Sequence, residues 1–266
     1  MVKGLYTAYT GLVNQQNRLD VLTNNLANSA TNGFKKEGTT TKTFGETLAI
    51  KIKDTSDFGI PKRLGEITPG VEIGENYTDY GQGPFRVTDN VYDIALDGDG
   101  FFAISFTNKA GETSVKYTRD GAFTVNTQGY LVTKDGDFVM NKNGALNSNP
   151  GEGSYIQVDP NVEVIIDEQG YLYQNNQEIG QLGVVDVADY NFIEKYGENM
   201  YQLADGGQIQ DSQAKSVQGT LEMSNVNVVS EMVEMITISR LFESNQKIMQ
   251  TTDETLEKAV NNLGRI

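Results

Sequence analysis

The chain contains no cysteine and no histidine among its 266 residues. The absence of cysteine excludes disulfides, thiolate zinc sites and cysteine nucleophiles. The absence of histidine removes the commonest metal ligand and the usual general base. Any enzyme chemistry would therefore rest on carboxylates, and we expect no metal site and no cofactor.

Long hydrophobic runs are also missing. No stretch of 18 consecutive apolar residues occurs, so the sequence predicts no transmembrane helix and no membrane insertion. The first thirty residues lack the basic-then-apolar layout of a secretory signal, so we expect export without a cleaved signal peptide, if the chain is exported. With 38% hydrophobic residues the chain can still bury a core of its own.

Positive charge is scarce, and the net charge is −15. Residues 1–38 carry four basic and two acidic side chains, and residues 226–266 carry four basic and six acidic ones, so the two ends sum to zero. All of the excess negative charge therefore lies between Thr39 and Asn225. This distribution argues against nucleic-acid binding and against adsorption to anionic lipid.

Proline is confined to the middle of the chain, and both ends show helical periodicity instead. In the first zone, four leucines recur at intervals of seven, which predicts a long helix with a narrow apolar seam from Met1 to about Thr31. Asn32 and Gly33 would supply its left-handed C-terminal cap. The predicted seam residues are Leu5, Leu12, Leu19, Leu22 and Leu26.

The last zone has neither glycine nor proline from about Asn225 to Leu263, and its apolar residues again recur every seven positions. This spacing predicts a second long helix, with Ser224, Asn225 and Asn227 as candidate caps. A helix of that length is typical of a coiled coil. The predicted seam residues are Val228, Met235, Ile238, Phe242, Met249, Leu256 and Leu263.

The middle zone alternates strand-like runs with Asp-Gly and Gln-Gly turn signals, which indicates a mostly antiparallel β-rich domain. The runs are Phe101–Phe106, Lys116–Val125, Gly129–Thr133, Val162–Asp167 and Gln181–Asp189. The predicted fold is therefore α+β, with the two long terminal helices pairing with each other as a coiled coil and a β-rich, mostly antiparallel domain between them in the sequence. The predicted segments are a helix over 1–35, an extended linker or arm over 36–80, the central domain over 81–224 and a helix over 225–266.

The first helix is crowded with amides near its end, at Asn24, Asn25, Asn28 and Asn32. These side chains are either a solvated helix surface near a frayed end, which spacing alone favours, or hydrogen-bonding groups that fix register across subunit contacts.

Several stretches together resemble the flagellar basal-body rod and hook family. "LDVLTNNLANSATNGFKK" is similar to the N-terminal motif of that family, and "QGTLEMSNVNVVSEMVEMITISRLFESNQKIMQTTDETLEKAV" (Gln218–Val260) is similar to its C-terminal segment. "DIALDGDGFFAI" and "YTRDGAFTVNTQGYLVTKDG" resemble its central β segments. The residues that match the N-terminal motif are Asn25, Leu26, Ala27, Asn28, Thr31, Gly33, Phe34 and Lys35.

This resemblance implies a structural protein of the bacterial flagellar basal body, exported unfolded through the flagellar type III apparatus. It would polymerise helically with itself into the axial drive shaft that transmits torque to the hook. Its other partners would be neighbouring rod proteins, the hook protein and ring or bushing proteins around the rod. Length and the "LEMSNVNVVSEM" stretch are most similar to distal-rod members, with proximal-rod or hook-type members as the alternative.

Other interpretations are less favoured. "DGDG" at Asp97–Gly100 begins like a calcium loop, but Phe101 and Asn108 occupy positions where acidic ligands belong, so a turn before a strand is expected. A secreted glycosidase acting on the cell wall needs only two carboxylates, but no pair among the 36 acidic residues is singled out. A secreted adhesin or effector with helical ends would share the export route but remain soluble.

Overall fold

The structure is a computed structural model that describes residues 2–45, 47–51, 62–68, 70–148, 150–151, 153–197 and 199–263. It divides into two compact units. The terminal unit consists of Met1–Ala27, Lys36–Asp79 and Asn227–Ile266, and the central unit consists of Asn28–Lys35 and Tyr80–Val226. With helices at both ends of the chain and antiparallel strands between them, the fold class is α+β, as predicted.

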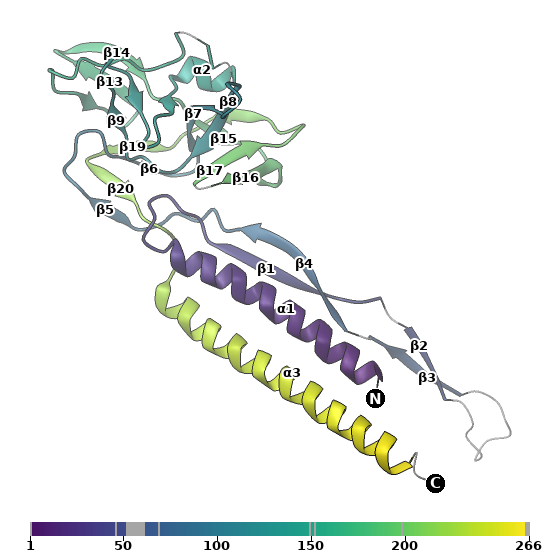
Figure 1. Cartoon of the computed structure of the whole chain (residues 1–266). Helices are drawn as coiled ribbons and strands as arrows, with labels where there is room; N and C mark the ends of the chain where they lie inside the picture. Colours follow the sequence, from purple (N-terminus) through teal and green to yellow (C-terminus); the bar gives the residue numbers. More distant parts are fainter. Residues whose placement is uncertain are drawn as a thin grey trace. The chain divides into compact units, whose positions relative to one another are not determined.

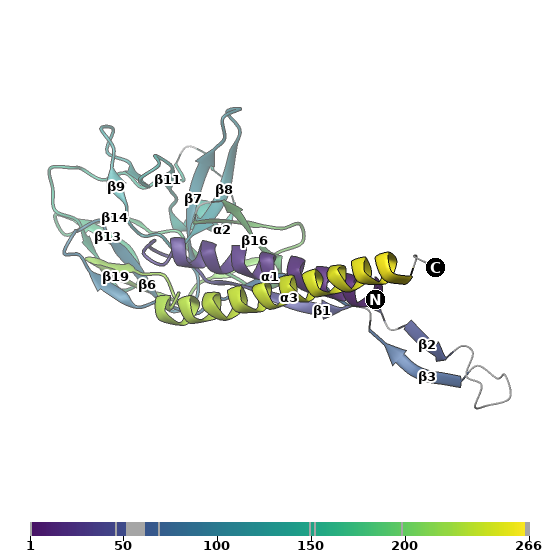
Figure 2. The same cartoon turned by 60° about the horizontal axis from the view of Figure 1, so that its bottom comes forward.

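Two long helices dominate the terminal unit. α1 (Val2–Ala27) has 26 residues and α3 (Val228–Leu263) has 36, and they run side by side in opposite directions (Figures 1 and 2). At the α-helical rise they are about 39 and 54 Å long. The predicted extension of the first helix to Thr31 is wrong: the helix ends at Ala27. Residues 28–33 form turns, and all of them except Ala30 are weak helix formers.

The start of α3 is set by Asn227. Its side-chain Oδ1 accepts a hydrogen bond from the Ser230 N–H (3.2 Å), and its carbonyl accepts one from the Glu231 N–H (3.0 Å). Asn227 is therefore the N-cap among the three candidates. Ser224 instead closes a local turn in the central unit, where its hydroxyl accepts from the Val226 N–H.

The described part of the segment predicted as an extended arm forms two antiparallel strand pairs, of which the first packs on α1. β1 (Glu37–Thr43) pairs with β4 (Val71–Thr78), and β2 (Thr47–Lys51) pairs with β3 (Lys62–Ile67). Asn14 ties β1 and β4 to the helix, because its Nδ2 donates to the Glu72 carbonyl (3.3 Å) and its Oδ1 accepts from the Thr41 hydroxyl (3.3 Å). This bonding explains why a polar residue is buried on α1.

The central unit is built almost entirely from short strands. Besides the helix α2 (Lys142–Leu146) and the 3₁₀ turn η1 (Tyr190–Phe192), it contains β5 (Phe85–Val87), β6 (Ile94–Asp97), β7 (Phe101–Thr107), β8 (Thr113–Thr118), β9 (Thr124–Val125), β10 (Leu131–Val132), β11 (Phe138–Val139), β12 (Ile165–Ile166), β13 (Tyr171–Gln174), β14 (Gln177–Gln181), β15 (Val184–Val187), β16 (Ile193–Gly197), β17 (Met200–Leu203), β18 (Ile209–Asp211), β19 (Lys215–Gln218) and β20 (Thr220–Glu222).

These strands pair antiparallel in every described ladder. The largest sheet has nine strands. Seven of them follow the order β16-β17-β8-β7-β11-β10-β9, and the other two, β15 and β18, are attached because β15 pairs with both β7 and β18. β12, β13 and β14 form a second sheet, while β19 pairs with β6 and β20 pairs with β5. The mostly antiparallel β centre predicted from the turn signals is thus confirmed.

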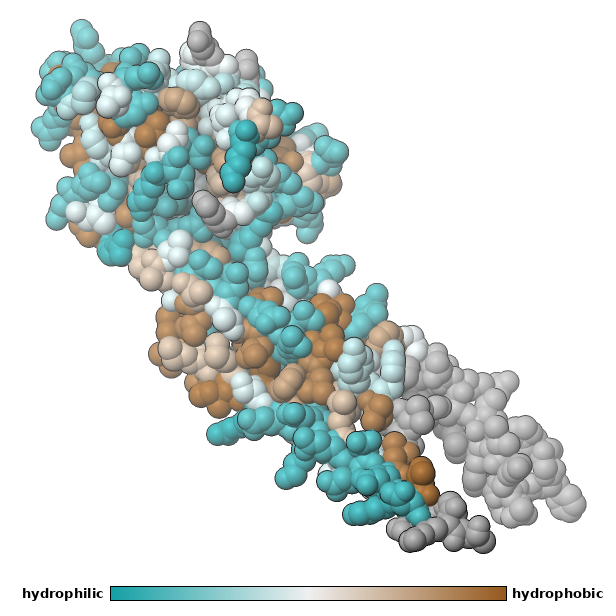
Figure 3. All heavy atoms as spheres, in the orientation of Figure 1, coloured by the Kyte–Doolittle hydropathy of each residue, from teal (hydrophilic) through white to brown (hydrophobic). Residues whose placement is uncertain are grey.

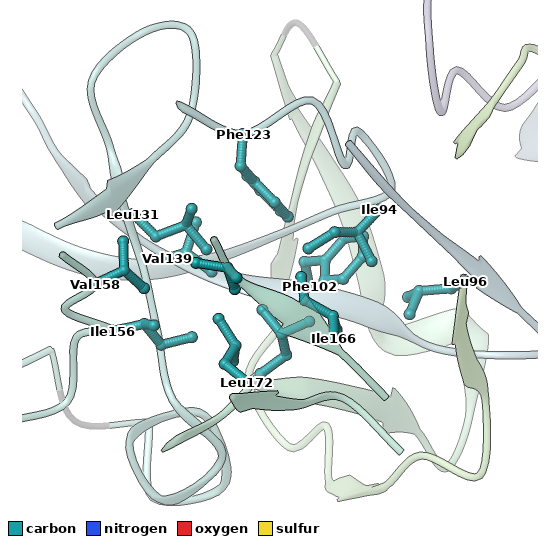
Figure 4. Close-up of a cluster of buried hydrophobic side chains, with 12 residues drawn as sticks. Ile94, Leu96, Phe102, Phe123, Leu131, Val139, Ile156, Val158, Ile166 and Leu172 are labelled. Atoms are coloured by element: carbon teal, nitrogen blue, oxygen red, sulfur yellow. The ribbon is translucent and has the colours of Figure 1, made fainter. Parts of the chain in front are cut away.

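Two hydrophobic clusters fill the central unit. Figure 4 shows one of them, in which Phe102 and Phe123 meet edge to face with ring centroids 5.1 Å apart. The second cluster gathers aromatic side chains around Phe101 and Tyr201, whose centroids are 5.4 Å apart. Alternate residues of β7 therefore supply both clusters, as expected for a strand with both faces covered.

Two strand predictions fail within the central unit. The run Gln181–Asp189 is divided, because β14 ends at Gln181 and β15 begins at Val184. The run Lys116–Val125 is not continuous, because β8 ends at Thr118 and β9 begins at Thr124. Gly121 lies in the break, and a Cβ at this position would come within 1.7 Å of the Ile94 carbonyl oxygen. The chain bends there because only glycine allows the two backbones to approach so closely.

Candidate functional site

The two terminal helices contact each other through a mixed polar and apolar face. Arg18 Nη2 lies 2.9 Å from Glu234 Oε1, Asn25 Nδ2 lies 3.2 Å from Glu231 Oε2, and Gly11 faces the Asn245 side chain. In α1 these three residues are spaced by seven and immediately precede three of the predicted seam leucines. The heptad period thus marks the side of α1 that faces α3, with the leucines lying beside the polar contacts.

The predicted seam residues are covered to different extents. Leu22 in α1 and Ile238 in α3 are fully buried. Nine others are partly buried, and the side chain of Leu263 lies outside the described residues. The partly buried ones are Leu5, Leu12, Leu19, Leu26, Val228, Met235, Phe242, Met249 and Leu256.

A second apolar row lies on α3 outside this contact. Val229, Met232, Val233 and Ile236 are each between 47% and 71% exposed. Their spacing of i, i+3, i+4 and i+7 places them on one face, and at about 3.6 residues per turn that face is opposite Glu231 and Ile238. Figure 3 shows the result on α3, whose surface is brown over its first part and teal toward its C-terminal half.

A buried carboxylate anchors the first turn of α3. Glu231 is fully buried and pairs with the Lys36 ammonium. Its Oε2 accepts from Asn25 Nδ2, which also donates to the Glu37 carbonyl (2.8 Å), while the Glu37 N–H donates to Asn25 Oδ1 (2.9 Å). The hydrogen bond to Glu231 raises the pKa of Lys36 above its ordinary value. We call Asn25, Lys36, Glu37 and Glu231 the helix-strand cluster, because they join α1, β1 and α3.

The central unit contains a second buried ionic group. Glu222 Oε1 accepts from Lys35 Nζ (2.7 Å) and from the Gly83 N–H (2.8 Å), and its Oε2 accepts from Arg119 Nη1 (3.2 Å). Lys35 and Arg119 further donate to the carbonyls of Gly81 (3.0 Å) and Gly98 (2.8 Å). The Lys35 and Glu222 side chains are each 1% exposed. We call Lys35, Arg119 and Glu222 the central ionic cluster.

Residues of the predicted family motif lie beside this cluster. Gly33 has a positive φ of 66° and donates its N–H to the Glu222 carbonyl (2.8 Å). Phe34 is buried, and Lys195 Nζ lies 4.3 Å from its ring centroid. Asn28 and Thr31 form the turn before them, with the Thr31 N–H donating to the Asn28 carbonyl (3.1 Å), and Ala27 is exposed at the end of α1. The motif thus shapes the segment that enters the central unit.

The solvated interpretation of the helix amides is wrong for Asn25 and incomplete for Asn32. Asn25 is fully buried in the helix-strand cluster. Asn32 accepts from Arg86 Nη2 at its side chain (3.2 Å) and from Asn199 Nδ2 at its carbonyl (2.7 Å). Both residues fix the path of the chain between α1 and β1 by hydrogen bonds within one molecule.

Sequence reasoning did not identify Arg119, Glu222 or Glu231 as buried charges. Each is one of many charged residues, and none stands at a local motif that requires burial. One feature of the sequence could have indicated the burial of Glu222. It lies in the short stretch "GTLEM", whose other residues are small or apolar, so a strand there would place its charge next to buried positions.

The "DGDG" segment lies in a turn before a strand, as expected. Gly98 and Gly100, in the "DGDG" segment, have positive φ values and form the turn between β6 and β7. Over the described part of the chain, no group of three acidic side chains is placed to hold a metal ion. No helix within that part is sufficiently long and apolar to span a membrane.

Comparison with known protein families matches three segments of this chain. Three family sequence models match: "Flagella basal body rod protein" over residues 5–35, "Flagellar hook protein FlgE/F/G D1 domain" over 95–186, and "Flagellar basal body rod FlgEFG protein C-terminal" over 217–263. These ranges cover both long helices and the core of the central unit.

Relatives align along the whole chain. The flagellar basal-body rod protein FlgG of Bacillus subtilis is 35% identical over 98% of this chain and 99% of its own length. FlgF of Caulobacter vibrioides, also a flagellar basal-body rod protein, is 33% identical over the full length of both. The flagellar hook-basal body complex protein FlhO of Bacillus subtilis is 31% identical, again over both full lengths. The chain therefore belongs to the family of flagellar basal-body rod proteins, whose members are structural and not enzymatic components of the flagellar basal body.

Proposed function

We propose that this chain is a subunit of the distal rod and polymerises helically with itself into the axial shaft that transmits torque to the hook. The observation that best supports self-assembly is the exposed apolar row of α3. After α1 and α3 have packed together, Val229, Met232, Val233 and Ile236 still face outward. Apolar surface of this kind is typical of an interface, and further copies of the same chain are its natural cover.

We further propose that α1 and α3 pair as a coiled coil. Along α3, one series of covered positions is spaced alternately by three and four residues, as knobs-into-holes packing requires. The series is 228, 231, 235, 238, 242, 245, 249, 252, 256 and 259, and positions 234 and 239 are partly covered beside it. The polar members Glu231 and Asn245 meet Asn25 and Gly11, which would set the register of the pair.

The seam residues take their proposed role from this arrangement. Leu22 and Ile238 are already buried within one chain, so their proposed role is to hold the two helices in place. The partly buried leucines of α1 and the partly buried residues Phe242 and Met249 of α3 are those whose burial neighbouring subunits would complete.

The placement in the distal rod is supported by chain length, by the "LEMSNVNVVSEM" stretch and by the similarity to FlgG. Its proposed partners are neighbouring rod proteins, the hook protein and ring or bushing proteins around the rod. We expect delivery through the flagellar type III export apparatus, without a cleaved signal. A proximal-rod position is the second candidate, because the similarity to FlgF covers both chains completely.

Labelling in purified basal bodies separates these positions. Asn175 and Asn176 form an exposed two-residue turn between β13 and β14, so an epitope inserted between them should leave the fold intact. Antibody-coupled gold on the distal part of the rod would support the proposal, provided that the tagged strain remains motile. Gold confined to the proximal rod would support the alternative, and gold on the hook would contradict both.

A further inference from the structure

A second apolar row lies on α1 and matches the one on α3. Tyr6, Tyr9 and Val13 are between 37% and 55% exposed, and their spacing places them on one face of the helix. Both rows extend over eight residues, from 6 to 13 and from 229 to 236, so the first and last residue of each row are about 10 Å apart at the helical rise. They contain no charged residue, although the chain as a whole carries −15.

The two rows do not lie level with each other within one chain. Two contacts fix how the antiparallel helices are aligned. Asn25 contacts Glu231, and Gly11, which lies 14 residues earlier in α1, contacts Asn245, which lies 14 residues later in α3. The row on α1 therefore lies level with about residue 246 of α3, 14 residues beyond the centre of the α3 row. At the helical rise this offset is about 21 Å.

We infer that the α1 row of one copy packs on the α3 row of a second copy displaced by about 21 Å along the helix axis. This inference rests on the proposed function, since it specifies which surfaces the polymer joins. In a helical polymer all subunits point the same way, so α1 of one copy meets α3 of the next in opposite directions, as within one chain. Under this shift Tyr9 faces Val233.

The contact is heterologous, because it joins two different rows. Each copy uses its α3 row for one neighbour and its α1 row for another, and such interfaces generate open helical assemblies when the rotation does not close a ring. The contact is also small. Three side chains on one copy and four on the other are far fewer than the roughly 20–30 residues per partner of a stable interface. Single copies should therefore stay apart in dilute solution and hold together only where several contacts act at once.

An engineered disulfide tests this pairing, because the chain has no cysteine of its own. The variant Tyr9→Cys with Val233→Cys cannot close a bond within one molecule, since the two positions lie about 21 Å apart along the helices and a disulfide requires Cα atoms within about 7 Å. In basal bodies purified from the bacterium that makes the protein, mild oxidation should yield a ladder of linked subunits on a non-reducing gel.

The matched control is Tyr9→Cys with Glu254→Cys, because Glu254 is an exposed position of α3 outside the row. The ladder should appear with Val233→Cys and be absent with Glu254→Cys. An amine-reactive cross-linker applied to the unmodified basal bodies reports separately whether copies of the chain adjoin one another. If that reagent gives a ladder and the cysteine pair at 9 and 233 does not, the inference is wrong while the polymer stands. If that reagent gives none, the proposed polymer itself fails.

A second test is needed if the cysteine variant fails to assemble. It introduces opposite charges at positions 9 and 233. Val233→Lys and Tyr9→Asp should each abolish motility without changing the unfolding temperature of the monomer, because both side chains are exposed in it. The two changes together should restore motility. Normal motility in the single variants, or no recovery in the double variant, would overturn the pairing.

Discussion

Lys35 Nζ lies 2.7 Å from Glu222 Oε1, although 187 positions separate the two residues in the sequence. Lys36, the next residue, pairs instead with Glu231 in the terminal unit. Two neighbouring lysines thus fix the chain to two different buried carboxylates, one on each side of the boundary between the units at residues 35 and 36.

The first prediction concerns the central ionic cluster. Glu222→Gln keeps an acceptor oxygen but leaves the buried cations Lys35 and Arg119 without their counter-ion. Removing one partner of a buried ionic group costs about 3–5 kcal/mol, so chemical denaturation should show a loss of that order. The matched control is Glu168→Gln, which breaks the exposed pair with Lys215 and should leave stability nearly unchanged. Equal effects of the two variants would contradict the assigned role of Glu222.

A second prediction concerns Gly33. Its φ of 66° disfavours any other residue, and a Cβ there would come within 2.4 Å of the Arg119 carbonyl carbon. Gly136 also has a positive φ, 96°, but a Cβ at that position would meet no atom within 4 Å. Gly136→Ala should therefore lose about 1–2 kcal/mol from backbone conformation alone, and Gly33→Ala should lose clearly more. Thermal unfolding of both variants measures the difference, and similar losses would show that the close approach is unimportant.

The third prediction concerns Asn25, which bonds to β1 and to α3 from within α1. Asn25→Ala would remove its bonds to the Glu37 N–H, the Glu37 carbonyl and Glu231 Oε2, at a net cost of about 0.5–1.5 kcal/mol for each bond. Gln16→Ala is the control, because Gln16 is exposed on the same helix. Hydrogen exchange of the β1 and α3 amides should speed up in the Asn25 variant only. Unchanged protection there would argue against the helix-strand cluster.

The fourth prediction concerns Asp120. Burial raises the pKa of its carboxyl, although the bond from the Ala122 N–H to Oδ1 (3.1 Å) opposes the shift. A folded-state pKa above the unfolded one means that the stabilising contribution is present below the unfolded pKa and is lost as pH rises through the folded pKa. Asp120→Asn keeps the acceptor and stays neutral, so it should be more stable than the parent at pH 7.

The advantage of Asp120→Asn should shrink as pH falls toward the ordinary pKa of an aspartate, near 3.8. Melting temperatures across this range check the trend. Asp205→Asn, at an exposed turn, controls for the general benefit of removing one negative charge from an acidic chain. A variant less stable than the parent at neutral pH would refute the assignment of burial as the dominant influence.

Local periodicity explains why the helices were predictable and several other features were not. The leucine spacing from Leu5 to Leu26 depends only on neighbours within a few turns, so it identified α1 without knowledge of its partner. The strand β1 reads "EGTTTKT", with little apolar alternation, and it is held by pairing with β4 and by Asn14 on α1. Such pairing is non-local, which is why no pattern predicted it.

Burial of charge was equally hidden. A glutamate such as Glu222 is usually solvent-exposed, and its burial here depends on Lys35, Arg119 and the Gly83 N–H, which come from three distant segments. The resemblance to the flagellar rod and hook family identified Lys35 as a motif position, but it did not identify Glu222 as the partner of Lys35. The role of the motif became clear only when the fold brought these segments together.

The division into units has a consequence for the order in which the protein can mature. Nearly all of the central unit is one continuous stretch, Tyr80–Val226, completed by the short upstream segment Asn28–Lys35. The terminal unit instead requires Met1–Ala27 and Asn227–Ile266, and so contacts between residues more than 200 positions apart. Non-local contacts of this kind form slowly. If the chain is delivered unfolded, as proposed, the contacts between α1 and α3 form only after delivery, and the two apolar rows take their final geometry last. A chain truncated before α3 would keep the continuous stretch of the central unit but would lack the α3 row, and so could not join its neighbours.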